Sequence, residues 1–369
     1  MVSEDEGNVT DGRPLAEGAW DESDTVGIIG LGLIGGSLAQ RLTARGVRVV
    51  AWNHRSHPYA AARAQGIECV DTIEEVALAR PRVLLLCNPL KAMPEVLASL
   101  KPVIDRRATI LSDVGSVKAL VREQVKEVGL EACYVGSHPM CGNERSGFDA
   151  ADARLFDDAL WALTVDEGTD YRRFLTMARF VLETVGDRFI VVDDATHDRA
   201  AAMISHAPHA VATALINGLV ASPDRDVAVA LSAGSWRDMT RVALTDPART
   251  RAMIEENSGN VEVLLRSLAR DLNDFADVLH AADESGMVRF FSQGQPFRAF
   301  KAHQGRQRRL ESASPGVAGV AGVGAGNEDV RRIDPSDWRS SFLTSARAGE
   351  QVVGFVSPWV IRVVPDCAI

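Results

Sequence analysis

The chain has 369 residues, of which 46% are hydrophobic and 24% charged, a composition typical of a soluble globular protein with room for two domains. Its formal net charge of -10 argues against general nucleic-acid binding, which needs a positive field along the phosphate backbone. The start at Met1–Glu6 is acidic, unlike a signal peptide, and no apolar run approaches the about 20 residues of a membrane span, so we expect a cytoplasmic protein with no membrane partner.

The first half of the chain alternates between short β-rich runs and longer helical runs. Residues 1–24 are polar and acidic and are expected to be a disordered leader. The repeated βα units that follow, over residues 25–192, predict a Rossmann-type doubly wound parallel sheet and define an expected dinucleotide-binding domain. The predicted strands are Val26–Ile29, Val47–Trp52, Ile67–Val70, Val83–Cys87, Thr109–Ser112 and Tyr134–Gly136, with Leu160–Val165 and Phe189–Val192 as possible extensions of the same sheet.

The second half has a different texture. Residues 193–303 carry helical patterns with almost no strand signal, which predicts an all-α domain. By analogy with other nucleotide-binding enzymes, and because this region is rich in Ala, Leu and Val, we expect it to form a substrate wall and the interface of a homodimer. Residues 304–369 begin with a low-complexity linker, Ser312–Asn327, and end in a β-like stretch broken by Pro358, to which we assign no role.

A glycine-rich turn organises the first domain. The run Val26–Ile29 leads into Gly30-x-Gly32-x-x-Gly35, and an apolar helix pattern follows at once. This order of strand, turn and helix is the context that makes the motif a dinucleotide-binding signature. Leu33 and Ile34 open the helix, whose free N–H groups and positive dipole end are expected to face the cofactor phosphates.

The end of the second predicted strand bears on the choice of nicotinamide cofactor. An NAD site usually has a carboxylate about 20 residues past the glycines, on the ribose 2′-hydroxyl. Here the strand ends in Asn53, His54, Arg55 and Ser56, with no acidic residue. Arg55 with Ser56 or His54 could receive a 2′-phosphate. Alternatively, Arg55 is a solvated loop residue and Asn53 holds a plain ribose; we favour NADP, or use of both NADP and NAD.

Two later segments are rich in polar and ionisable side chains that can take part in catalysis. They are Ser112–Lys118 (SDVGSVK) and Gly136–Gly147 (GSHPMCGNERSG), both expected beyond the C-terminal ends of strands. His138 could take a proton from a substrate hydroxyl near neutral pH. The alternative is a loop histidine that satisfies a backbone carbonyl.

These segments, with three others in the same order, resemble the prephenate/arogenate dehydrogenase family of tyrosine biosynthesis. The resemblance runs from about Val26 to Phe300 and rests on GLGLIGGSLA, DVGSVK, SHPMCGNERSG, THD with SHAPH, and GSWRDMTRVA. It implies NAD(P)-dependent oxidation of a cyclohexadienol, coupled to loss of its ring carboxylate as CO2. The substrate is prephenate, giving 4-hydroxyphenylpyruvate, or its aminated form arogenate, giving tyrosine.

The resemblance also implies roles for individual residues. His138 would accept the C4 hydroxyl proton, and Ser116 would hydrogen-bond that hydroxyl and His138. Arg241 would clamp a substrate carboxylate, and Asp238, three residues earlier, could hold Arg241 in place, although the pair is also consistent with a structural salt bridge. Glu144 is expected to be a gate or orienting residue.

The predicted long helix contains three histidines. His206 and His209 are three residues apart and share a face, whereas His197 falls on the opposite face, so one metal cluster of all three is not expected. The five cysteines contain no Cys-x-x-Cys pair, so neither a disulfide framework nor a metal site is expected from them. The resemblance implies that His206 and His209 lie near the substrate and that His197 with Asp198 lies at the domain junction. For each histidine, a satisfied core position is an equal alternative.

Two other classes of protein share part of this pattern. A β-hydroxyacid dehydrogenase or imine reductase joins a similar sheet to a helical domain but typically uses a helical lysine, which the predicted long helix lacks. A redox sensor or scaffold that only binds the cofactor would keep Gly30 to Gly35 and would not need His138, Ser116 and Arg241 together.

Overall fold

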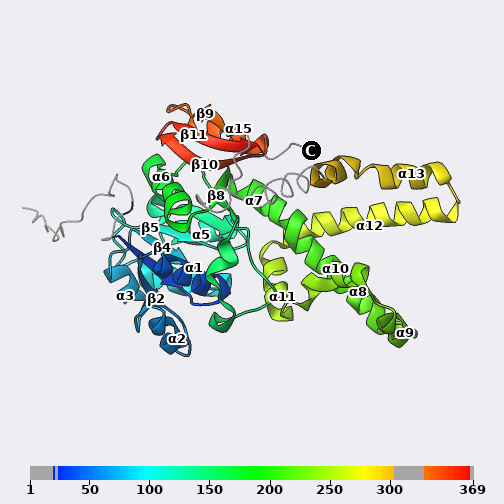
Figure 1. The fold of residues 1–369 in the computed structure, drawn as a ribbon, viewed down its shortest axis with the longest axis horizontal. Helices are drawn as coiled ribbons and strands as arrows, with labels where there is room; N and C mark the ends of the chain where they lie inside the picture. The colour runs from blue at the N-terminus through cyan, green and yellow to red at the C-terminus, as the bar shows by residue number, and fades with distance from the viewer. Residues whose placement is uncertain (1–19, 21–23, 303–327, 366–369) are drawn as a thin grey trace, which may run out of the picture.

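The structure is a computed structural model, and it describes Trp20, residues 24–302 and residues 328–365. The other residues of the expected leader and the linker Ser312–Asn327 lie outside the described residues. The described chain forms two sheets at one end of the molecule and a helical arm that extends away from them (Figure 1).

The first sheet has five parallel strands in the order β3-β2-β1-β4-β5, which confirms the Rossmann-type prediction. Alternate residues of β1 and β4 enter two different buried clusters, for example Leu85 on one face and Leu84 on the other. Both faces of the sheet are therefore covered by packed apolar side chains, as expected for a parallel sheet. The strands are β1 (Thr25–Ile29), β2 (Arg48–Trp52), β3 (Glu68–Cys69), β4 (Val83–Leu86) and β5 (Ile110–Asp113); the helices are α1 (Leu33–Ala44), α2 (Tyr59–Ala64), α3 (Ile73–Leu78), α4 (Met93–Leu100) and α5 (Ala119–Glu127).

A second sheet follows, and here the prediction of one extended sheet is wrong. The strands β6 (Gly136–Pro139), β7 (Leu160–Thr164) and β8 (Arg188–Val192) pair with one another, with β6 antiparallel to β7. In the described residues, an isolated parallel bridge joins the two sheets at Leu111 and Tyr134. The chain reverses direction between β6 and β7, so β7 and β8 cannot continue the parallel order of the first sheet. Helix α6 (Tyr171–Arg179) and a π-helical turn (Phe180–Val185) connect β7 to β8.

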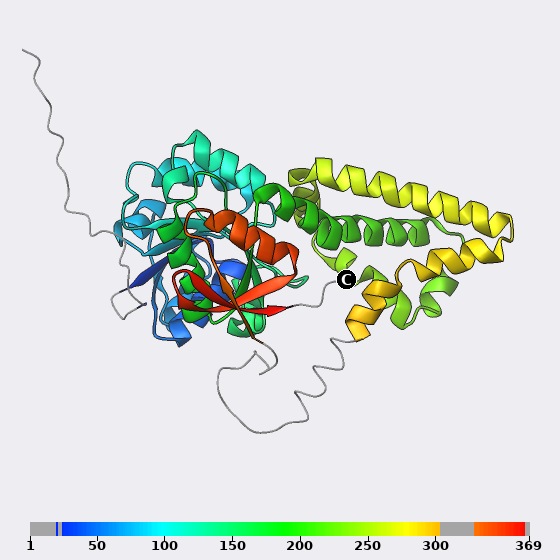
Figure 2. The same ribbon diagram turned by 90° about the horizontal axis from the view of Figure 1, so that it is seen from above.

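Strands give way to helices directly after β8. Helix α7 (Asp194–Ala201), a π-helical turn (Ala202–His206) and α8 (Ala207–Ala221) form one continuous stretch where a single long helix was predicted. The π-helical turn ends two residues before Pro208, whose missing N–H cannot continue a regular helix. The arm is completed by α9 (Arg225–Ala230), α10 (Gly234–Thr240), α11 (Pro247–Glu256), α12 (Ser258–His280) and α13 (Glu284–Ser292) (Figure 2).

The C-terminal residues, to which the sequence assigned no role, return to the second sheet. They form β9 (Asp329–Arg332), α15 (Trp338–Arg347), β10 (Glu350–Ser357) and β11 (Val360–Pro365), and Pro358 lies in the turn between β10 and β11. Strand β10 pairs with β8, which gives the order β6-β7-β8-β10-β11-β9. The Trp338 ring stacks on Phe174 at 5.0 Å and the Trp359 ring on Tyr171 at 4.2 Å, so apolar packing fixes this segment against α6.

Among the described helices, none combines the length and apolar character that crossing a membrane would require.

Candidate active site

The glycine turn between β1 and α1 is shaped by close backbone contacts. Gly30 has φ of 109°, and a Cβ there would lie 2.7 Å from the Cys87 carbonyl oxygen. A Cβ on Gly35 would lie 2.0 Å from the Gly30 carbonyl oxygen. At both positions the protein itself requires glycine, because any side chain would collide with backbone.

Gly32 differs from its two neighbours in the motif. A Cβ built on it meets no atom within 4 Å, and its φ of -86° is accessible to any residue. Neither packing nor conformation explains the glycine, so the open space beside it fits an approaching ligand. Gly32 is the N-cap of α1, no described side chain caps this helix, and its first turn has no acidic residue. The N–H groups of Leu33 and Ile34 are thus placed as a dinucleotide pyrophosphate requires.

Asn53, at the end of β2, ties the loops of this site together. Its Oδ1 accepts a hydrogen bond from the Leu31 N–H at 2.8 Å, and its Nδ2 donates to the Arg55 carbonyl at 2.8 Å. Asn53 therefore supports the glycine turn, a role that the sequence did not predict. His54, Arg55 and Ser56 follow on the exposed surface, and no described residue binds their side chains through a hydrogen bond or ion pair.

His138 lies within a strand, which corrects its predicted position beyond the end of one. Strand β6 begins two residues later than predicted because Val135 still bonds to Leu111 of the first sheet, at 3.0 Å. His138 then pairs with Ala162 of β7. The strand fixes its backbone, and its half-buried ring lies against the helix that follows β8.

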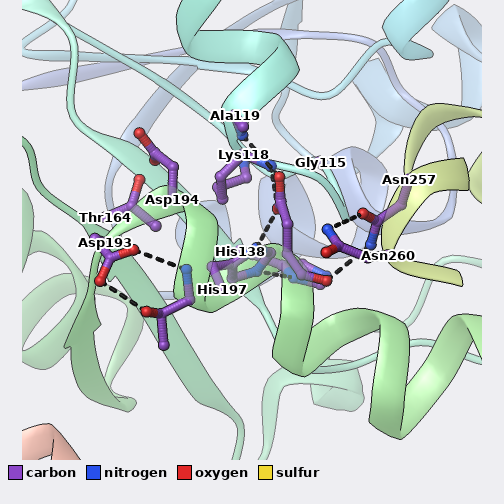
Figure 3. Close-up of polar contacts among 12 residues, drawn as sticks. Gly115, Lys118, Ala119, His138, Thr164, Asp193, Asp194, His197, Asn257 and Asn260 are labelled. Carbon is purple, nitrogen blue, oxygen red and sulfur yellow. Dashed lines mark hydrogen bonds and ion pairs between the residues drawn. The ribbon is translucent and has the colours of Figure 1, made fainter. Parts of the chain in front are cut away.

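The ring of His138 belongs to a chain of three side chains. Its Nδ1 lies 2.9 Å from His197 Nε2, and His197 Nδ1 lies 2.8 Å from Asp198 Oδ1 (Figure 3). Asp198 also accepts hydrogen bonds from the backbone N–H groups of Lys118 at 2.7 Å and Ala119 at 3.0 Å. Asp198 of α7 and the N-terminus of α5 are thus joined at the candidate site.

The positions of the protons on His138 and His197 follow from the ionisation of Asp198. Burial alone would raise the pKa of Asp198, but hydrogen bonds from His197 and from two backbone N–H groups hold it below its ordinary value. An ionised carboxylate only accepts, so His197 carries its proton on Nδ1 and, when neutral, accepts at Nε2. The donor to that atom is Nδ1 of His138. Nε2 of His138 is then left without a proton, and it has no hydrogen-bond partner among the described residues.

The surroundings of His138 keep it neutral. Burial lowers its pKa well below 6.5, and the neighbouring His197 and Lys118 lower it further. The Lys118 ammonium is fully buried beneath it, bound to the Asp113 carboxylate and, at 2.7 Å, to the carbonyl of Ser137. Tyr134 donates to the other oxygen of Asp113 at 2.7 Å. The motif DVGSVK therefore forms a rigid polar support under the strand that carries His138.

His206 and His209 occupy two different environments. His206 is fully buried, and its Nδ1 lies 3.1 Å from Nδ2 of Asn257, which also donates to the Asp198 carbonyl at 2.8 Å. Burial lowers the pKa of His206 to about 4, and its Nε2 has no described partner. His209 is half-buried, with Nδ1 2.9 Å from the Ser205 carbonyl. Asn257 had no signal in the sequence.

Several predicted site residues are not brought together. The Asp238 carboxylate lies 3.8 Å from Arg237, and no ion pair joins it to Arg241 in the described structure. The prediction that Asp238 holds Arg241 is therefore wrong for this chain: α10 ends at Thr240, and the 3-10 turn Arg241–Leu244 breaks the regular three-residue spacing.

Ser116, Glu144 and Arg241 are the remaining predicted residues. No described hydrogen bond links Ser116 to His138, whose ring partner is His197. Glu144 and Arg241 are exposed, and no described contact joins Arg241 to His138. Across the described parts of the chain, no group of three His, Cys, Asp or Glu side chains is arranged to hold a metal ion.

Comparison with known proteins identifies relatives for this site and fold. Two family models match, described as "Prephenate dehydrogenase, nucleotide-binding domain" over residues 38–191 and "Prephenate dehydrogenase, dimerization domain" over residues 193–293. The cyclohexadienyl dehydrogenase of Zymomonas mobilis is 31% identical over 279 residues, covering 74% of this chain and 94% of that protein.

Solved structures give the same result. The prephenate dehydrogenase of A. aeolicus in complex with hydroxyphenyl propionate and NAD+ matches with a TM-score of 0.68 and 28% identity over 75% of this chain and 97% of that one. A structure from Corynebacterium glutamicum matches with a TM-score of 0.71 and 29% identity, covering 89% of this chain and 98% of that one.

Proposed function

The chain belongs to the prephenate dehydrogenase family, and on that premise we propose that it oxidises and decarboxylates prephenate to 4-hydroxyphenylpyruvate. As a member of this family it is a nicotinamide-dependent oxidoreductase. Arogenate, the aminated substrate, is the alternative. The observation that carries the proposal is the hydrogen-bonded chain from Asp198 through His197 to His138, because it leaves one unprotonated ring nitrogen facing away from the chain.

The reaction mainly requires the protein to position the substrate, the cofactor and a base. The bound nicotinamide supplies the hydride acceptor, held through the glycine turn and the first N–H groups of α1. Nε2 of His138 takes the proton of the C4 hydroxyl as hydride leaves the same carbon. The ring carboxylate then departs as CO2, its bonding electrons complete the aromatic ring, and the resulting phenolate oxygen can take the proton back from His138. Aromatisation drives the loss of CO2. The protein must therefore mainly orient the groups that take part in the hydride and proton transfers.

The ionised Asp198 has a defined part in that first stage. It fixes the tautomer and ring orientation of His197, which in turn fixes His138, and it favours the imidazolium that forms when the proton is taken. Because α5 and α7 both contribute to this arrangement, the sheet domain and the helical domain must keep their relative position during turnover.

Substrate contacts are also proposed, on the family resemblance, for six residues: Arg241, Asp238, Glu144, Ser116, His206 and His209. Arg241 has no described partner, and its planar fork suits a carboxylate. Nε2 of neutral His206 is buried and carries a proton that no described group accepts, so a contact with a polar group of the substrate would satisfy it only if binding opens a path to this atom.

The finer cofactor preference that we propose is NADP, or use of both NADP and NAD. The end of β2 exposes Arg55 and Ser56 without described side-chain partners, and the only side-chain amide there, Asn53, already supports the glycine turn. A guanidinium and a hydroxyl suit a 2′-phosphate, whereas an NAD site usually has a carboxylate at this place.

The family's dimerization domain covers the arm, and we propose that two copies of this chain pair through it. Sixteen of the nineteen large hydrophobic side chains that are exposed in the described chain lie between Met203 and Phe297. Such a concentration of apolar surface on one region is typical of a surface buried in an assembly.

The proposed function is tested by the appearance of reduced nicotinamide with prephenate or arogenate as substrate and NAD or NADP as acceptor. We expect turnover of prephenate with release of CO2 and a lower KM for NADP than for NAD. Absence of turnover in all four combinations would contradict the proposed function. Turnover of arogenate alone would replace prephenate by the alternative substrate.

A further inference from the structure

The loop that follows His138 is held from the helical arm by one side chain. Arg249, in the first turns of α11, donates through one terminal nitrogen to the Asn143 carbonyl at 2.9 Å and through the other to the Arg145 carbonyl at 2.8 Å. The two acceptors are the carbonyls on either side of Glu144. A guanidinium that binds both therefore fixes the backbone from which the Glu144 side chain projects.

The ends of this loop are fixed by other contacts, and its middle is not. Met140 bonds to Leu160 of β7 at 2.8 Å, and the buried Phe148 packs against α1 at Gly36. Between them, Glu144, Arg145 and the residues up to Gly147 are exposed. In the described structure, the hydrogen bonds from Arg249 are the ones that connect this middle part to the arm.

On the side of the arm, the backbone of Arg249 is fixed by its own helix. The Asp246 side chain caps α11 by accepting a hydrogen bond from the Arg249 N–H at 3.0 Å. Helix α11 contacts the π-helical turn that ends at His206. Arg249 thus links the His138 loop to the helix that packs beside the buried His206.

We propose that Arg249 is a positioning residue that keeps the 141–147 loop closed over the substrate site and so sets substrate affinity. The role in substrate binding rests on the proposed function; the closure of the loop does not. Arg249 does not touch the proton chain of His138, His197 and Asp198, so its loss should act on KM far more than on kcat. The bidentate geometry matters, because lysine offers a point charge that cannot bridge the two carbonyls in the same way.

The test compares Arg249→Met and Arg249→Lys with Arg251→Met. Arg251 lies on the same helix, is exposed, and pairs only with Glu255 at 3.3 Å among the described residues, which makes it a matched control. For Arg249→Met we expect about a tenfold rise in KM for prephenate with kcat changed less than about threefold. Arg249→Lys should be intermediate, and Arg251→Met and the Kd for reduced nicotinamide should match wild type.

A second readout needs no substrate. Arg145 lies in the released loop and is a site for trypsin, so Arg249→Met should be cut after Arg145 about ten times faster than wild type under native conditions. Unchanged cleavage in Arg249→Met, or an equal change in Arg251→Met, would overturn loop closure by Arg249. If wild type turns over neither substrate, the proposed function fails, while the cleavage rates still decide whether the loop is held. Faster cleavage with an unchanged KM would overturn the role in substrate affinity.

Discussion

The sheet region and the helical arm differ in how far each buries its own apolar surface. All residues of β1 and β4 are buried, and the two hydrophobic clusters that contain them draw no member from α8 to α13. By contrast, the 23-residue helix α12 buries only Val261, and Leu272 on it is 61% exposed. The sheet region therefore has a complete core in one chain, and the arm does not.

This difference matters for the candidate site because the site joins the two regions. His138 is carried by the sheet region, whereas His197 and Asp198 belong to the first helix of the arm. The proposed base, His138, should thus depend on local geometry that one chain supplies. Its orientation should depend on α7, the first helix of an arm whose exposed apolar surface we propose to be covered by a second copy. The following predictions test this division.

The largest effect is expected for His138→Asn. Asparagine cannot act as a base, so kcat should fall by about 100-fold to 10,000-fold. Binding of reduced nicotinamide, measured by fluorescence titration, should stay at the wild-type level, because the sheet region keeps its core. His57→Asn, on the exposed loop after β2, is the control for loss of a histidine. Retention of wild-type turnover in His138→Asn would exclude this residue as the base.

The glycine turn offers a matched pair within the sheet region. Gly35→Ala places a Cβ 2.0 Å from the Gly30 carbonyl oxygen and should lower the free energy of unfolding by about 3 kcal/mol or more. Gly32→Ala places its Cβ in open space, so stability should stay within about 0.5 kcal/mol while cofactor affinity falls. Chemical denaturation and cofactor titration separate the two. Unchanged cofactor affinity in Gly32→Ala would show that the open space at Gly32 is not a ligand site.

The arm is tested by Leu272→Asp. A charge on the exposed apolar face of α12 should convert the proposed homodimer to a monomer, observed as a halved mass in sedimentation equilibrium. Asn273→Asp adds the same charge at the next residue and should leave the dimer intact. Because the sheet region has its own core, Leu272→Asp should still bind reduced nicotinamide. A wild-type chain that is monomeric at all concentrations would contradict the inference that a second copy covers the apolar surface of the arm.

The smallest effect concerns pH and the junction between the regions. The pKa of buried His206 is about 4 and its ordinary value is 6.5, so the unfolded state binds a proton that the folded state does not between these values. The free energy of unfolding should thus fall as pH drops through this window, by up to about 1.4 kcal/mol per pH unit for this histidine. Urea denaturation from pH 7 to 4 measures the slope. His206→Gln should flatten it, and His57→Gln should not.

The sequence predicted the features that are local along the chain. The glycine turn, the parallel strands and the change to helices after residue 192 each have a signature within a few neighbouring residues. The motif also predicts a role for Gly32 at the cofactor, which stays a prediction; the structure adds that the space beside this glycine is open.

Features that depend on distant residues were missed. His138 and His197 are 59 positions apart, and nothing in either segment indicates that Nδ1 of His138 lies 2.9 Å from Nε2 of His197. Asn257 stands in no motif, and the pairing of Asp238 with Arg241 failed because the helix ends between them. The β-rich tail was left without a role because its partner, β8, lies far upstream and beyond a low-complexity stretch.

That tail has a consequence for the boundaries of the protein. Strand β6, with His138, stands at one margin of the second sheet, and the chain's own last strands occupy the other side of β8. Shortening the protein to its two family domains would remove β10 from the free edge of β8 and the rings of Trp338 and Phe342 from Phe174, although β8 would still pair with β7. A bare sheet margin of this kind recruits other chains, so the second sheet is complete only with the segment that ends at Pro365.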